Sequence, residues 1–161
     1  MKPSSLLAPV LALAPASAMA GSISIDLSRL SVAEYHRPYV AIWIEGAGIQ
    51  PRTVAVWYDA DHRGDPGTKW LSDLRGWWRV AGRNIGTPPS GISGATRAPG
   101  HHTIPLPADL KPGVYTLKVE AARETGGREL VSVPFTLPRT GGKGAGNGAG
   151  GEIGAVAVTL P

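Results

Sequence analysis

Hydroxyl-bearing side chains stand among very small residues in the stretch Ser-Gly-Ile-Ser-Gly-Ala-Thr, residues 90–96. Pro88-Pro89 precedes this stretch, and Pro99-Gly100 follows it closely. Because such residues interrupt helices and strands, they predict that Thr96 lies on a solvent-facing loop. A hydroxyl with little steric cover is within reach of a modifying enzyme. The residue types therefore predict that the Thr96 hydroxyl is accessible to such an enzyme.

The same stretch resembles the motif at which flavin transferases of the bacterial cell envelope link FMN to threonine through a phosphodiester. That motif has an acidic or small polar residue, two variable positions, Ser or Thr, and then Gly-Ala-Thr. Ser90 stands at the position that is often acidic, and Ser93, Gly94, Ala95 and Thr96 complete the pattern. The resemblance implies that Thr96 carries the FMN, while the three residues before it form the sequence that the transferase reads.

Four further residues complete the expected flavin site. Arg97 follows Thr96 directly and can balance the charge of a phosphodiester. Trp70, Trp77 and Trp78 offer aromatic faces that can stack on a flavin ring. The same tryptophans are spaced by the threes and fours of a helix, so they also fit a structural role as core anchors. We favour the structural role for at least two of the three.

The N-terminus has the pattern of an export signal. Lys2 precedes a short apolar run over residues 6–14, and Ala18-Met19-Ala20 provides a cleavage site. These features predict a signal peptide over residues 1–20, cleavage after Ala20 and a periplasmic protein. No later segment approaches the ~18 apolar residues of a membrane helix, so stable membrane insertion is not expected. The sequence contains no cysteine, which excludes disulfides, thiolate nucleophiles and cysteine metal ligands.

Residues 21–161 read as a single β-rich domain. Short runs of β-forming residues alternate with Gly- and Pro-containing turns, which favours a mainly β, immunoglobulin-like antiparallel sandwich. The predicted strands are 23–27, 39–44, 53–58, 102–106, 113–120, 130–137 and 155–160. Helical spacing over residues 68–79 predicts one short inserted helix. The Gly-rich segment 141–152 is predicted to be a flexible loop before the last strand.

Several segments together resemble the bacterial predicted periplasmic proteins grouped as domain of unknown function 2271. They are residues 37–45, 54–58, 70–79, 93–100 and 119–124, in order along the chain. The resemblance implies an envelope redox system in which a flavin transferase and a PepSY-domain membrane protein are partners. On this interpretation the chain is an electron carrier with FMN attached to Thr96, and not an enzyme in its own right.

Other function classes receive less support. The formal charge of +4 is scattered among acidic residues and forms no basic stripe, so nucleic acid is not an expected partner. Ser93 and Asp73 can be combined with a histidine on paper, but the nucleophile-elbow pattern is incomplete. Neither His101-His102 nor the turn with Asp59, Asp61, His62 and Asp65 has metal-ligand spacing. The alternative that stays open is a binding or docking module without a cofactor.

Overall fold

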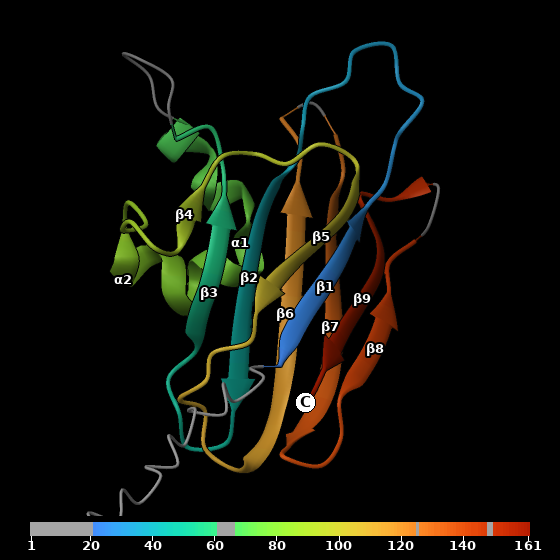
Figure 1. The fold of residues 1–161 in the computed structure, drawn as a ribbon. Coiled ribbons are helices and arrows are strands. Elements are labelled where there is room, and N and C mark those ends of the chain that lie inside the picture. Colours follow the sequence, from blue (N-terminus) through green and yellow to red (C-terminus); the bar gives the residue numbers. More distant parts are fainter. Residues whose placement is uncertain (1–20, 61–66, 125, 148–149) are drawn as a thin grey trace, which may run out of the picture.

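Two β-sheets lie face to face in the computed structural model, and a helical segment covers the outer face of one of them (Figure 1). The structure describes residues 21–60, 67–124, 126–147 and 150–161, so the predicted signal peptide lies outside the described residues. The strands are β1 Ser22–Leu27, β2 Tyr39–Gly46, β3 Arg52–Trp57, β4 Ser93–Gly94, β5 Gly100–Pro105, β6 Gly113–Ala122, β7 Arg128–Leu137, β8 Gly142–Ala145 and β9 Ile153–Thr159. The prediction of a mainly β fold is confirmed.

The four-stranded sheet has the order β5-β1-β9-β8, with antiparallel neighbours throughout. In β1 the side chains of Ile23, Ile25 and Leu27 are buried, and the residues between them are partly exposed. Because successive side chains of a strand point to opposite faces, this alternation turns one apolar row toward the other sheet. The sequence pattern predicted this strand correctly.

The five-stranded sheet has the order β4-β3-β2-β6-β7, and only the short β4 runs parallel to its neighbour. Its strand β2 is buried on both faces. Val40, Ile42 and Ile44 join the core between the sheets, whereas Ala41 and Trp43 join a second core beneath the helical segment. The unbroken apolar run of β2 is explained by these two cores, since neither face meets solvent.

The helical segment is longer than predicted and changes its geometry along its length. A 3₁₀ turn, η1 Gly67–Asp73, leads into α1 Arg75–Trp77, then a π-helical turn, η2 Trp78–Gly82, and α2 Arg83–Ile85. Leu71, Leu74 and Trp77 are buried against the five-stranded sheet. Their spacing was readable in the sequence, but the continuation to Ile85 was not predicted.

The carboxylate of Glu120 on β6 anchors this helical segment to the sheet. Glu120 is fully buried and accepts hydrogen bonds from the backbone N–H groups of Gly76 (3.0 Å) and Trp77 (2.8 Å). Arg128 donates to the same carboxylate from β7. These three hydrogen bonds compensate the Glu120 carboxylate for the hydration that it loses on burial. The two from backbone N–H groups hold α1 in place against the sheet.

The Gly-rich segment differs from the predicted flexible loop, because Gly142–Ala145 forms strand β8 and pairs with β9. A Cβ atom on Gly142 would overlap the carbonyl oxygen of Pro134 and lie 2.7 Å from Val133 Cγ1. Glycine is therefore needed where β8 crosses close to β7. The composition suggested flexibility, whereas the packing requires the absence of side chains.

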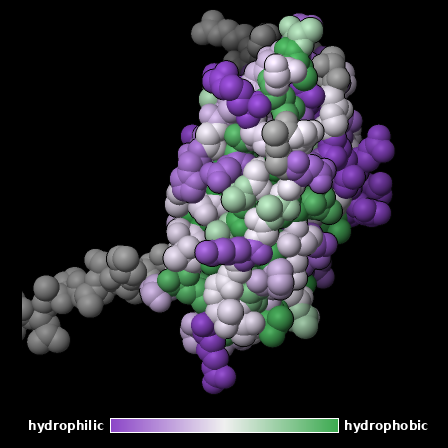
Figure 2. Space-filling view, turned by 90° about the vertical axis from the view of Figure 1, so that its right-hand side faces the viewer, coloured by the Kyte–Doolittle hydropathy of each residue, from purple (hydrophilic) through white to green (hydrophobic). Residues whose placement is uncertain are grey.

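The surface on the right of Figure 1 is seen face-on in Figure 2, where hydrophilic and hydrophobic residues are intermixed. No helix among the described residues is both long and apolar enough to cross a membrane.

Candidate functional site

The predicted modification motif lies where the chain passes from one sheet to the other. We call residues 95–99 the strap, because they connect β4 in the five-stranded sheet to β5 in the four-stranded sheet. The strap is held at its start by β3, since Tyr58 N donates to the carbonyl of Gly94 (2.9 Å) and Val56 N donates to that of Ile92 (2.7 Å). The connection crosses the edge of the sandwich (Figure 1).

Thr96 is half-buried at the middle of an unpaired stretch of backbone. Among the described residues, Ala95, Thr96 and Arg97 make no backbone–backbone hydrogen bond. The next backbone group with a hydrogen-bond partner is the carbonyl of Ala98, which lies 2.7 Å from the side-chain atom Nε2 of His102. Segments with few backbone bonds open at low free-energy cost. Thr96 can therefore swing outward without the loss of a sheet hydrogen bond.

Trp57, Arg97 and His102 form an aromatic and cationic cluster beside the strap. The guanidinium of Arg97 lies over the ring of Trp57, 5.3 Å from its centroid, and His102 meets the same ring edge-on at 5.6 Å. Gly94 packs flat against this indole, because a Cβ there would lie 3.3 Å from Trp57 Cδ1. Arg97 is exposed while Trp57 is buried, so the guanidinium is both positioned by the ring and available to an anion.

A hollow of about 510 Å³ opens beside the motif, between β3 and the end of β5. Ser93, Gly94 and Arg97 line it together with Trp57 and the apolar side chains of β3 and β5. Arg52 stands at its rim and donates to both carboxylate oxygens of Asp109 at 2.7 Å. These hydrogen bonds hold the pKa of the Asp109 carboxyl below its ordinary value. The hollow thus combines cations with an apolar wall, beside the motif that contains Thr96.

Trp70, Trp77 and Trp78, which could stack on a flavin ring, are not among the residues that line the hollow beside the motif. Trp77 is fully buried and donates from its indole nitrogen to Thr53 Oγ1 (2.9 Å), and Trp78 is half-buried beside it. Trp70 is partly exposed under the ammonium group of Lys69. The aromatic residue that the fold brings to the motif is Trp57, which the sequence presented only as a strand residue.

His101 and His102 are each engaged by another group. His101 Nδ1 lies 2.6 Å from Asp26 Oδ1 and His102 faces the strap, so neither histidine serves Ser93 as a base. The part of the chain that the structure describes contains no group of three or more side chains suited to hold a metal ion. Asp61, His62 and Asp65 of the expected solvated turn lie outside the described residues.

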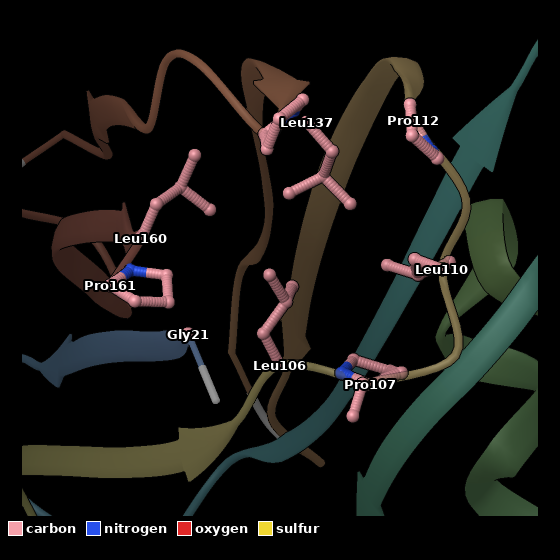
Figure 3. Close-up of a pocket in the computed structure, with 10 residues that line it drawn as sticks. Gly21, Leu106, Pro107, Leu110, Pro112, Leu137, Leu160 and Pro161 are labelled. Carbon is pink, nitrogen blue, oxygen red and sulfur yellow. The ribbon is translucent and has the colours of Figure 1, made fainter. Parts of the chain in front are cut away.

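A second hollow, of about 260 Å³, lies at the end of the sandwich (Figure 3). Leucine and proline side chains from the ends of several strands surround it, among them Leu106, Leu137 and Leu160. None of the described side chains that line it carries a charge or a hydroxyl group. It includes none of the motif residues.

The comparison with protein families places the chain in one of them. The family described as "Predicted periplasmic protein (DUF2271)" matches residues 20–155, and the chain therefore belongs to this family. The resemblance to this family that was inferred from the sequence is confirmed. A search of curated proteins and a search of solved structures gave no match.

Proposed function

We propose that this chain is an exported electron carrier of an envelope redox system, with FMN attached covalently to Thr96 by a flavin transferase. The observation that carries the proposal is the setting of Thr96. Thr96 lies in the centre of a backbone stretch that forms no backbone–backbone hydrogen bond with other described residues, and it precedes Arg97, which is exposed and lines the hollow. Family membership supports the periplasmic location. We further infer that the sandwich is immunoglobulin-like.

The attachment needs a donor in which the FMN phosphate is part of a phosphoanhydride, that is, a flavin dinucleotide. The anhydride bond breaks, a bond forms between Thr96 Oγ and the phosphorus, the hydroxyl proton is released, and a nucleoside monophosphate leaves. Small residues at Gly94 and Ala95 leave the approach to Thr96 open. Arg97, the next residue, would balance the remaining negative charge of the phosphodiester.

The residues around Thr96 fit such a group. Arg97 would hold the phosphodiester, and the apolar part of the hollow, with Val54 and Ile104, would shield the ring from water. FMN supplies electron transfer through its ring, which attachment by the phosphate leaves free. A tether also keeps the carrier loaded where no cytoplasmic pool can replace lost cofactor. A PepSY-domain membrane protein is the proposed electron donor or acceptor.

Mass spectrometry tests the proposal directly. The chain is co-expressed with an exported flavin transferase, purified from the periplasm and weighed intact. We expect a gain equal to FMN minus water, mapped to the peptide that contains Thr96. Thr96→Ala should abolish the gain and the yellow colour, whereas Thr87→Ala, which removes an exposed hydroxyl outside the motif, should leave both unchanged.

An unmodified mass would overturn the proposal if the same transferase modifies a known substrate in the same cells. The chain would then be better described as a docking module without a cofactor. The mature mass from the same measurement also tests the predicted cleavage after Ala20.

A further inference from the structure

A basic hollow lies on the helical segment, separate from the modification motif. It has a volume of about 520 Å³ and is lined by Ser72, Trp78 and four arginines, Arg75, Arg79, Arg83 and Arg128. The first three arginines come from the segment that covers the five-stranded sheet, and Arg128 comes from the start of β7. The motif lies at the other edge of the same sheet, beside β3 and β4.

The described residues around this hollow do not balance its charge. None of those that line it is acidic. Arg75, Arg79 and Arg83 are exposed, and none of them forms an ion pair with another described residue. Arg128 is the one arginine of the four with an ion-pair partner in the described part of the chain, the buried Glu120, whose carboxylate also accepts two backbone hydrogen bonds. Three guanidinium groups are therefore left with excess positive charge.

The spacing of the three unpaired arginines works against the stability of the segment. They recur every fourth residue, which places them on one side of the helical segment, and like charges at this spacing repel each other. Stability alone does not account for such an arrangement. A bound anion would account for it, because each guanidinium group would then be attracted to the anion that lies between them.

The chemistry of the hollow indicates which anion. All of its cations are arginines, whose planar guanidinium groups donate two parallel hydrogen bonds to phosphate oxygens. Trp78 forms a firm wall, since it is half-buried and its ring packs at 6.1 Å from that of the fully buried Trp77.

We propose that this hollow binds a ligand with two or more phosphate groups. The ligand is either a soluble phosphorylated compound or the headgroup region of anionic lipid, which share the same chemistry. This inference is independent of flavin attachment at Thr96 and can fail or hold without it.

Calorimetry with the mature chain tests the site, with inorganic pyrophosphate as the soluble probe and vesicles of phosphatidylglycerol or phosphatidylcholine as the lipid probes. The test variant is Arg79→Gln with Arg83→Gln. Arg128 is retained, because its removal would leave Glu120 without its charged partner. The matched control is Arg29→Gln with Arg139→Gln, which removes the same charge from exposed positions outside the hollow.

We expect one pyrophosphate per chain, bound at least tenfold more weakly by the test variant and within twofold by the control. Binding of phosphatidylglycerol vesicles alone, with the same dependence on Arg79 and Arg83, would identify lipid phosphate as the source. Absence of binding to both probes would overturn the proposal. Equal weakening in test and control variants would also overturn it, because net charge would then be the cause. Polyglutamate serves as a third probe. If the chain binds polyglutamate but not pyrophosphate, the proposal is overturned in favour of a carboxylate-bearing partner.

Thermal unfolding adds a readout that a structural role would not produce. Without ligand, the test variant should melt at the same temperature as the native chain or higher, because repulsion is relieved. Pyrophosphate should raise the melting temperature of the native chain and not that of the variant. A lower melting temperature of the unliganded variant would show that these arginines stabilise the fold, which contradicts the proposal.

Discussion

At the scale of single residues, Glu120 connects three parts of the molecule. Its carboxylate on β6 bonds the backbone of α1 and the side chain of Arg128 on β7. Arg128 in turn lines the basic hollow. One buried carboxylate thus positions both the helical segment and an arginine of the proposed phosphate site.

Replacement of Glu120 should be costly. Glu120→Ala leaves two backbone N–H groups and a guanidinium without their acceptor, and we expect a loss of about 3–5 kcal/mol in the free energy of unfolding. Urea denaturation followed by circular dichroism measures it. Glu120→Gln, which keeps one acceptor oxygen, should lose less and serves if the alanine variant does not fold. The exposed Glu124→Ala is the control and should change little. A loss below about 1 kcal/mol for Glu120→Ala would contradict the anchoring role.

At the scale of the elements, strand β8 shows how composition can mislead. Its high glycine content is typical of a flexible linker. In the structure, however, Gly142 and Gly144 lie against the side chains and backbone of β7. The two sheets approach each other closely at this edge. Each glycine is therefore a packing requirement.

A side chain at Gly142 should separate the two strands. For Gly142→Ala we expect a loss of about 1–3 kcal/mol in unfolding free energy, the range typical of overpacked positions. The neighbouring Lys143 is exposed on the same strand, so Lys143→Ala should stay within about 0.5 kcal/mol of the native chain. Chemical denaturation of both variants measures the difference. Equal stabilities would mean that β8 yields without cost, as a flexible loop would.

At the scale of the whole molecule, β2 joins two hydrophobic cores. Its residues alternate between the core of the sandwich and the core beneath the helical segment. Trp77 belongs to the second core and Leu117 to the first. Because one strand serves both, neither core should unfold alone.

We expect fluorescence and circular dichroism to report a single unfolding transition. Leu117→Ala, at a fully buried position of the sandwich, should lower the stability by about 2–5 kcal/mol and move both signals together. The exposed Val114 on the same strand provides the control, since Val114→Ala creates no cavity. Two separated transitions, with only part of the tryptophan fluorescence following Leu117→Ala, would indicate that the helical segment is an independent unit, because Trp57 shares the sandwich core with Leu117 whereas Trp43 and Trp77 do not.

The sequence by itself determined the β-rich class, most strand positions, the start of the helical segment and the family, because these depend on local periodicity and short motifs. It also marked Thr96 and Arg97 as neighbours, since adjacency needs no fold. Only the tertiary structure decided that Trp57 packs against Gly94 and lines the hollow beside the motif, whereas Trp70, Trp77 and Trp78 do not line it. It alone joined Arg128 to the arginines of the helical segment and turned a Gly-rich stretch into β8. Contacts between distant segments depend on how sheets and helices pack against each other, and local sequence patterns do not predict that packing.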